Sequence, residues 1–511
     1  MIGERILHEL KKLLSGSDIR GNAVEYDGNS IDLTDEVVYS IAKAFAYWLS
    51  AKTKEKLTIA VGHDSRISAE RIKTQVIKAL KESGCIVLDC GLCSTPSMFL
   101  MTQYENIHAN GSIMITASHH PYHKNGLKFF DTDGGLEAED IKGILSLAQS
   151  GSSLKGRGGK ILEEDYLKIY CETLIEKFRK STKEQYPLKN LKIVVDAGNG
   201  AGGFFVDRVL KPLGADTSGS QYLEPDGMFP NHVPNPENPD AMRHISECVI
   251  NNKADLGIIF DTDVDRAACV APDGQEINRN RLIALISAIL LEEQPGATIV
   301  TDSVTSDALT QFIINLQGNH HSFKRGYKNV INEAKELNKI GVYAPIAIET
   351  SGHAAFLENY FLDDGAYLII RILIKLCQLK KQNKTILSLI EDLKDPIESK
   401  ELRLGFSSKC KDWKAAAKDI LNRFELIAGK KIGFKLAQSY EGVRVNFSGG
   451  WLLIRMSVHD PIMPINIESD KIGGVYYACK KLYGILKKFK DLDLTNLKNF
   501  LTDQKTQRKK K

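Results

Sequence analysis

A serine followed by two histidines stands just after a short apolar run. Residues 111–116 are Gly-Ser-Ile-Met-Ile-Thr, and Ser118, His119 and His120 follow after one alanine. In open α/β sheets functional groups collect beyond the carboxyl ends of the strands, so we expect Ser118 to be exposed there. A serine in a turn or helix cap is the alternative, and the G-x-S-x-G motif of serine hydrolases is absent. The adjacent histidines and the nearby Lys128 favour a functional role.

Three aspartates at alternate positions follow a second apolar run. In an extended segment, Asp261, Asp263 and Asp265 would point to one side. Their charges repel one another unless a divalent cation binds, and oxygen ligands without His or Cys favour Mg²⁺ or Ca²⁺ over zinc. A calcium EF-hand does not fit, because Arg266 takes its glycine position and Pro272 its glutamate position. A solvated acidic turn is the alternative.

Two later stretches carry groups suited to sugar and phosphate recognition. Glu349, Ser351 and His353 follow another apolar run and would share one face of an extended segment. A carboxylate beside a hydroxyl suits vicinal sugar hydroxyls, although a helix N-cap is an equal alternative. Arg455 and Ser457 lie on a predicted turn, where they could form a phosphate cradle, with an ordinary loop as the alternative.

Composition limits the function classes. The 511 residues predict about three or four domains. The 68 Lys and Arg residues nearly balance the 64 Asp and Glu residues, which argues against a nucleic-acid binder. No apolar run reaches the ~18 residues of a membrane span. The amphipathic pattern of residues 1–14 predicts a helix rather than a signal peptide, and the basic end from Lys505 to Lys511 predicts a solvated, frayed tail.

The cysteines point to a reducing compartment. Nine of them are scattered along the chain, and the single C-x-x-C pair, Cys90 and Cys93, has no second pair at zinc spacing. We therefore expect a buried thiol pair there and a cytoplasmic location.

Short apolar runs alternate with helical patterns through most of the chain. This βαβ order predicts α/β domains with helices covering the sheets. Near the end, Gly449 and Gly450 join two strand-like runs at 442–448 and 451–457, which predicts a hairpin and a final α+β domain with an antiparallel sheet. The other expected elements are strands near 58–62, 85–91, 111–116, 191–200, 254–263, 297–303 and 343–350, helices near 68–83, 96–105 and 164–180, and a surface connection at 151–160.

The four chemistry-bearing stretches, in this order, resemble the α-D-phosphohexomutase family. The resemblance covers nearly the whole chain. Further matching motifs are Ser17-Asp-Ile-Arg20-Gly21, Gly62-His-Asp64-Ser-Arg66, Asp196-Ala-Gly198-Asn199-Gly200 and Pro225-Asp-Gly-Met-Phe-Pro-Asn231-His232.

The resemblance implies four domains around a central cleft, three α/β domains with mixed sheets and a C-terminal α+β domain. The expected boundaries are 1–165 for the phosphoserine domain, 166–275 for the metal domain, 276–395 for the sugar domain and 396–511 for the phosphate domain. It also implies an enzyme that moves a phosphoryl group between the 1 and 6 positions of a hexose. A bisphosphorylated sugar would be both intermediate and activator. We expect a monomer or homodimer that binds small sugar phosphates, and neither nucleic acid nor membranes.

Site residues follow from the same resemblance. Ser118 matches the phosphoserine, which would complete the Mg²⁺ site of Asp261, Asp263 and Asp265. The sugar loop contains Glu349 and Ser351, and the phosphate loop Arg455 and Ser457. The residues matched to proton transfer, phosphate positioning or substrate contact are Arg20, His119, Lys128, Lys328 and His353.

The sequence departs from the family pattern in the loops. Thr262 and Val264 replace two glycines of the metal loop, and His120 stands where asparagine is usual. In the phosphate loop the differences are at Val458, His459, Asp460 and Pro464. The start of the chain favours mannose and glucose phosphates, with a phosphoglucosamine mutase as the alternative. A catalytically weak sugar-phosphate binding protein and a phosphatase are alternatives of other classes.

Overall fold

The computed structural model describes residues 10–156, 158–163, 165–457 and 460–510. The chain forms two compact units, Met1–Ile289 with Ser351–Glu391, and Leu290–Thr350 with Asp392–Lys511. In the described part of the chain, no helix has the length and apolar character needed to cross a membrane.

The first sheet of the first unit is mixed. Its strand order is β1-β2-β6-β5-β3-β4-β8, with β7 paired to β6. Strands β5, β3, β4 and β8 run parallel, whereas β6 is antiparallel to β5 and β2. The strands are β1 (Leu14–Ser15), β2 (Asp18–Asn22), β3 (Thr58–His63), β4 (Ile86–Leu92), β5 (Gly111–Ile115), β6 (Lys124–Asp131), β7 (Gly134–Gly135) and β8 (Lys160–Glu163).

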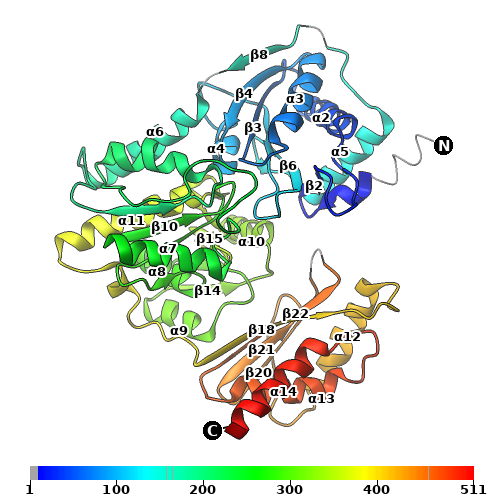
Figure 1. Ribbon diagram of the computed structural model, residues 1–511, viewed down its shortest axis with the longest axis vertical. Coiled ribbons are helices and arrows are strands. Elements are labelled where there is room, and N and C mark those ends of the chain that lie inside the picture. Colours follow the sequence, from blue (N-terminus) through cyan, green and yellow to red (C-terminus); the bar gives the residue numbers. More distant parts are fainter. Residues whose placement is uncertain (1–9, 157, 164, 458–459, 511) are drawn as a thin grey trace. The chain divides into compact units, whose positions relative to one another are not determined.

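Amphipathic helices cover this sheet. Helix α2 packs against α3 and α5 (Figure 1), and their apolar faces join one buried core with the strands. Thr34 caps α2 through its side chain, and Ser94 begins α4 with a capping box. The helices are α2 (Asp35–Ser50), α3 (Ala69–Glu82), α4 (Thr95–Leu100) and α5 (Ala138–Ser150).

A second, four-stranded sheet has the order β12-β11-β10-β9. Strands β9 and β10 are parallel, and β10 turns directly into the antiparallel β11. Its strands are β9 (Ile193–Asp196), β10 (Leu256–Phe260), β11 (Ala267–Val270) and β12 (Glu276–Ile277). The helices that follow along the chain are α6 (Tyr166–Thr182), α7 (Pro239–Asn252) and α8 (Asn280–Glu293). The first unit also contains β16 (Ala354–Phe356), β17 (Leu362–Asp363) and α11 (Gly365–Lys381).

The second unit begins with three parallel strands in the order β14-β13-β15. They are β13 (Thr298–Thr301), β14 (Asn319–Ser322) and β15 (Ile346–Ile348). Helix α9 (Asp307–Asn315) follows β13, and α10 (Tyr327–Lys339) follows β14. The side chain of Ser306 caps α9.

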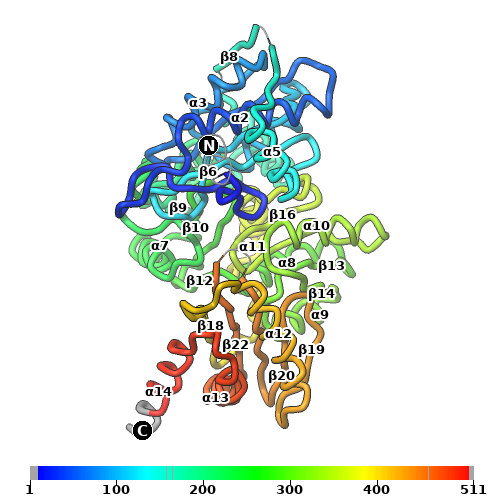
Figure 2. Tube along the Cα trace, turned by 90° about the vertical axis from the view of Figure 1, so that its right-hand side faces the viewer, coloured from blue at the N-terminus to red at the C-terminus, as the bar shows by residue number. Residues whose placement is uncertain are grey.

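The C-terminal sheet is antiparallel, with the order β18-β22-β21-β20-β19. Helices cover it (Figure 1), and Figure 2 shows α13 beside β18 and β22. The strands are β18 (Glu398–Gly405), β19 (Lys435–Ala437), β20 (Val443–Phe447), β21 (Gly450–Ile454) and β22 (Ile462–Ser469). The helices are α12 (Trp413–Ala428), α13 (Gly474–Leu486) and α14 (Thr495–Lys510). The α/β domains with mixed sheets, the antiparallel final domain and the hairpin are therefore confirmed.

Three local predictions were wrong. The N-terminal helix does not reach Leu14, because a 3₁₀ turn at Lys11–Leu13 leads into β1, while residues 1–9 lie outside the description. The predicted helix at 96–105 ends at Leu100. The tail is helical through Lys510, because Leu497 is fully buried and fixes the first turns of α14 on the final core. Glu164, where the third predicted helix was to begin, is not described.

Candidate functional site

Ser118 lies at one edge of the first sheet, beyond the end of β5. Strands β5, β3 and β4 are parallel neighbours, so the residues that follow them gather at this edge. Ser118 has a positive φ of 51° and is only 4% exposed. The expectation of an exposed serine is therefore wrong within this unit, because Asp261 and Arg266 contact its hydroxyl.

The serine loop is held by its own side chains and by those that follow β3. The Ser118 amide donates to Thr116 Oγ1 (2.8 Å), and that hydroxyl donates to Asp64 Oδ2 (2.6 Å). The buried guanidinium of Arg66 donates to four carbonyls of the loop. These belong to Ser118, His120 (2.6 Å), Pro121 (2.8 Å) and Lys124 (2.9 Å). Because four backbone carbonyls share one side chain, Arg66 fixes the shape of this loop.

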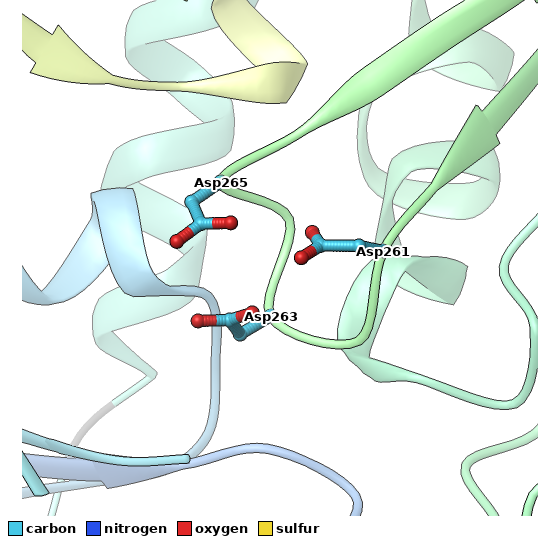
Figure 3. Close-up of side chains that lie close together, drawn as sticks. All are labelled: Asp261, Asp263 and Asp265. Atoms are coloured by element: carbon cyan, nitrogen blue, oxygen red, sulfur yellow. The ribbon is translucent and has the colours of Figure 1, made fainter. Parts of the chain in front are cut away.

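The three aspartates lie in the turn between β10 and β11 and are buried. Figure 3 shows their carboxyl groups gathered at this turn, and one oxygen or more from each lies within 4.8 Å of the others. The segment is not extended as expected, because Val264 has a φ of 64°. The turn itself, rather than strand alternation, brings Asp261, Asp263 and Asp265 together.

Val264 occupies a position where the family pattern has glycine. Its left-handed backbone is unusual for a β-branched residue and costs about 1–2 kcal/mol. The side chain is fully buried, which offsets part of that cost. Thr262 is also buried, and its carbonyl accepts from the Ala201 amide (2.8 Å). The residue that follows the motif Asp196–Gly200 therefore binds the backbone of the acidic turn.

Two buried cations partly balance the three acids. Lys128 Nζ donates to Asp263 Oδ2 (3.0 Å) and Asp265 Oδ2 (2.5 Å). Arg266 Nε donates to Asp261 Oδ2 (3.0 Å). Burial and the Asp265 charge raise the pKa of Asp261 well above its usual range. Burial alone would also raise the pKa of Asp265, yet Lys128 and other nearby cations hold it below its usual range.

The cluster fits a divalent cation. Two buried carboxylate oxygens, Asp263 Oδ1 and Asp265 Oδ1, accept no hydrogen bond within the described structure. Their Oδ2 partners are already bound by Lys128, and the nearest cations to Asp265 Oδ1, Arg266 Nε and His353 Nε2, lie 3.7 Å away, so both Oδ1 atoms remain as ligands. An orphaned buried carboxylate oxygen is costly unless a cation or donor satisfies it. Oxygen donors alone suit a hard cation such as Mg²⁺ or Ca²⁺.

The Ser118 hydroxyl connects the serine loop to the acidic turn. Its Oγ donates to Asp261 Oδ2 (3.2 Å) and accepts from Arg266 Nη2 (2.8 Å). The same Nη2 donates to His119 Nδ1 (2.7 Å), so the neutral ring carries its proton on Nε2. Burial and the Arg266 charge lower the pKa of His119 far below its usual range. His119 can therefore donate from Nε2, and its Nδ1 is poorly suited to accept a proton.

Three other expected residues lie near this group. Arg20 Nη1 donates to the Ala117 carbonyl (3.3 Å), and Arg20 Nη2 pairs with Asp18 (2.9 Å). His353 Nε2 lies 3.7 Å from Asp265 Oδ1, and its Nδ1 lies 2.8 Å from Ser351 Oγ. The segment around Ser351 is a turn, since Gly352 has a φ of 94°, so it does not have the extended form assumed in the sequence analysis.

The remaining expected residues belong to the second unit. Glu349 is buried, and its Oε1 accepts from the Gly326 amide (2.7 Å). Lys328 lies in the first turn of α10, directly after that glycine. The next residue of the sugar loop, Thr350, donates through its hydroxyl to Asp302 Oδ2 (2.6 Å). Glu349 therefore binds the loop that carries Lys328.

The predicted phosphate loop follows β21. Arg455 is 7% exposed, and its Nε is buried without a hydrogen-bond partner among the described residues. Burial lowers the pKa of Arg455, and the carboxylate of Glu441 opposes that effect. Ser457 Oγ accepts from the Asp460 amide (3.2 Å). Val458 and His459 lie outside the described residues, and Pro464, in β22, accepts the Arg455 amide through its carbonyl (3.1 Å).

Several residues of these networks were not among the predicted site residues. Thr95, which follows β4, donates through its hydroxyl to Asp263 Oδ2. Arg66 and Asp64 follow β3, and only their motif was noted. The positions of Thr95 and Arg66 after parallel strands were a usable signal. Glu441 carried no such signal, because its contacts are with distant segments.

Comparisons with known proteins agree with this architecture. The α/β/α domain I model of phosphoglucomutase/phosphomannomutase matches residues 11–155, the domain II model 168–274 and the domain III model 278–395. A phosphomannomutase/phosphoglucomutase of Pseudomonas syringae pv. tomato is 30% identical over 462 residues, covering 88% of this chain and 92% of that protein.

Solved structures show the same fold. A phosphoglucomutase/phosphomannomutase family protein from Burkholderia thailandensis has a TM-score of 0.78 and 25% identity, covering 94% of this chain and 98% of its own. The N-acetylphosphoglucosamine mutase of Aspergillus fumigatus, in complex with GlcNAc-6P and magnesium, has a TM-score of 0.53 and 12% identity, covering 95% and 99%. At that identity the second likeness concerns the fold alone.

Proposed function

The chain belongs to the phosphoglucomutase/phosphomannomutase family, and we propose that it interconverts the 1-phosphates and 6-phosphates of mannose and glucose through Ser118. One observation carries the assignment of this residue. Its Oγ contacts both Asp261 and Arg266, so a phosphoryl group on it would lie against the acidic turn and a buried guanidinium. The domain boundaries proposed are 1–165, 166–275, 276–395 and 396–511, which the three matched ranges support.

Asp261, Asp263 and Asp265 are proposed to hold Mg²⁺ together with an oxygen of the phosphorylated Ser118. The unpaired Oδ1 atoms of Asp263 and Asp265 support this assignment. When bound, Mg²⁺ would offset negative charge on the transferring phosphoryl group. Arg266 has the same task from the protein side, because it reaches Ser118 Oγ and remains charged at all relevant pH values.

The transfer needs a proton balance. As the bond from phosphorus to Ser118 Oγ breaks, a bond to a sugar hydroxyl oxygen forms, that hydroxyl loses its proton and Ser118 Oγ gains one. His119 is proposed to donate to a phosphoryl oxygen from Nε2, which its Nδ1 contact with Arg266 supports. Lys128 and His353 remain as the proposed proton carriers, and Arg20 as a positioning cation. The reverse transfer from the bisphosphorylated sugar, at its other phosphate, restores phosphorylated Ser118.

The remaining predicted residues are proposed to bind the sugar and its second phosphate. Glu349 and Ser351 would accept from sugar hydroxyls, and Lys328 would contact the substrate. Arg455 and Ser457 would hold the phosphate that does not react, which the unpaired Nε of Arg455 supports. A hexose 1,6-bisphosphate is the proposed activator, because it can phosphorylate Ser118. We also propose a monomer or homodimer and a cytoplasmic location, which the nine free cysteines favour.

The direct test uses the purified protein with Mg²⁺ and a trace of glucose 1,6-bisphosphate. Glucose 1-phosphate, mannose 1-phosphate and glucosamine 1-phosphate are supplied separately, and ³¹P NMR follows the products. We expect glucose and mannose 6-phosphates to form, and formation to stop in Ser118→Ala. Conversion of glucosamine phosphate alone would assign the glucosamine activity instead. Free phosphate alone would indicate a phosphatase, and no product a sugar-phosphate binding protein.

A further inference from the structure

Glu441 binds two neighbouring segments of the second unit, which follow the paired strands β13 and β14. Its Oε1 accepts from the Ser303 hydroxyl and from the Arg325 amide (3.0 Å). Ser303 follows β13, whereas Arg325 lies in the loop between β14 and α10. Two donors that converge on one carboxylate oxygen fix the distance between these segments.

Glu441 is itself anchored beside Arg455. Strands β20 and β21 pair Val443 with Ile454, which places residue 442 against the start of the predicted phosphate loop. Gly442 has a φ of 59°, and a Cβ there would lie 2.8 Å from Arg455 Cα and 2.2 Å from the Ile454 carbonyl oxygen. The close approach and the left-handed backbone both require glycine. The Glu441 side chain therefore starts from a fixed point next to Arg455.

The loop that Glu441 holds is also held by the predicted sugar loop. Two adjacent backbone amides of this loop donate to different carboxylates. The Arg325 amide donates to Glu441, and the Gly326 amide donates to Glu349 (2.7 Å). Lys328 follows two residues later. Asp302 is the residue before Ser303, and its carboxylate accepts from the hydroxyl of Thr350 in the sugar loop (2.6 Å). One network thus reaches all the segments of this unit proposed to bind substrate.

Charge supports the same conclusion. The positive charge of Arg325 disfavours the charged form of Arg455, and Glu441 is the largest of the opposing influences. Without this carboxylate, the two guanidinium groups would repel each other more strongly, and only Asp302 and Glu401 would still favour the charged form of Arg455. A substrate phosphate would then meet displaced rather than prearranged cations.

We propose that Glu441 is a positioning residue that sets the spacing between Arg455 and the segment made of loop 323–326 and the first turn of α10, and so determines affinity for the substrate's non-reacting end. This inference rests on the proposed function. It requires no contact between Glu441 and the sugar phosphate. Loss of the side chain should therefore weaken substrate binding much more than it slows the chemistry at Ser118.

The test compares Glu441→Ala, Glu441→Gln and Ser303→Ala in the full-length protein. For Glu441→Ala we expect the KM for glucose 1-phosphate to rise about tenfold with kcat within threefold of wild type. Glutamine retains an Oε1 acceptor for both donors, so Glu441→Gln should stay within about threefold in KM. Ser303→Ala should raise KM about threefold, and adding it to Glu441→Ala should have no further effect, because both remove the same contact.

Glu398→Gln is the matched control. Like Glu441, Glu398 accepts two hydrogen bonds, here from the amides of Gly473 (2.6 Å) and Val475 (2.9 Å), and neither donor belongs to a proposed substrate loop. It should lower the melting temperature without changing KM. The proposal is overturned if Glu441→Ala leaves KM unchanged, or if Glu398→Gln raises KM as much.

Calorimetry with glucose 1-phosphate separates this inference from the proposed function. If the wild-type protein does not convert the sugar, the proposed mutase activity fails. Glu441 is then judged on affinity alone, where a tenfold loss in Glu441→Ala supports the positioning role and an unchanged affinity refutes it. If Glu441→Ala does not fold, Ser303→Ala decides instead: a KM rise of about threefold supports the positioning role, and an unchanged KM refutes it. Glu441→Gln should then stay within about threefold of wild type in KM.

Discussion

The two units solve the burial of charge differently. In the first, Asp261, Asp263 and Asp265 are packed into one short turn, and two carboxylate oxygens accept no hydrogen bond from the described residues. In the second, Glu349 and Glu441 each accept from a backbone amide of a neighbouring loop, and these hydrogen bonds hold the segments together. Unsatisfied acids are suited to binding a cation, whereas satisfied acids are suited to fixing loops.

This difference predicts that substitutions in the two units affect different kinetic constants. The hydroxyl of Ser118 contacts two charged side chains directly, so changes in the first unit should act on kcat. The charged groups of the second unit are distant from one another in sequence and depend on a few bridging contacts. Changes there should act mainly on KM.

The largest expected effect would break the first half of this comparison. Ser118→Ala should reduce mutase activity by about 10⁴-fold or more, because no other group can carry the phosphoryl group. Coupled-assay kinetics with glucose 1-phosphate measure this loss. Ser112→Ala is the control, since Ser112 Oγ lies buried without a hydrogen-bond partner on the strand that leads to the same loop. Residual activity above a hundredth of wild type in Ser118→Ala would exclude the proposed role.

Metal binding tests the unpaired oxygens. Removing divalent cations with EDTA should abolish activity, and Mg²⁺ should restore it. Mg²⁺ at 100 times its Kd should also stabilise the wild-type fold by about 2.7 kcal/mol. Asp263→Asn should lose most of this thermal shift, because it removes one charged ligand from the turn. Asp273→Asn changes an exposed turn residue and should respond to Mg²⁺ as wild type does. An equal shift in Asp263→Asn would refute the assignment of that ligand.

Arg455 tests the second half of the comparison. Arg455→Lys should raise KM about tenfold while kcat changes little, because an ammonium group cannot bind a phosphate in the two-pronged way of a guanidinium group. Steady-state kinetics separate the two constants. Arg403→Lys, in strand β18 of the same sheet and with its Nε on Glu401 (2.7 Å), is the control and should leave both unchanged. A fall in kcat with constant KM would place Arg455 in the chemical step instead.

The smallest expected effect concerns acid stability. Burial and the Arg20 charge lower the pKa of His120 to about 3. The unfolded chain then binds a proton below about pH 6.5 that the folded chain does not, so stability is complete above that value and declines as the pH falls towards 3. Between pH 6.5 and 5 the free energy of unfolding of the wild-type protein should fall by about 1–2 kcal/mol because of His120. His120→Asn should not show this fall.

Urea unfolding at pH 7.5 and pH 5 measures this difference. His108→Asn, at an exposed turn position, should show the same pH dependence as wild type. An unchanged pH dependence in His120→Asn would contradict the lowered pKa.

The sequence determined the order of the elements and most of the residues that lie together at the serine and the acidic turn. Alternating apolar runs specify strands and helices locally, and motifs placed directly after strands predict functional positions because parallel strands end at a common edge. This is how Ser118 and the three aspartates could be named. Their side-chain types also restricted the metal to a hard cation.

Only the tertiary structure decided how these groups are held. The burial of Ser118 depends on Arg266, which is distant in sequence, and the acids converge through a turn rather than an extended strand. The roles of Arg66 and Glu441 arise from contacts with loops far along the chain. Such contacts leave no local pattern, because a hydrogen bond depends on where two segments meet in space and not on their spacing in sequence.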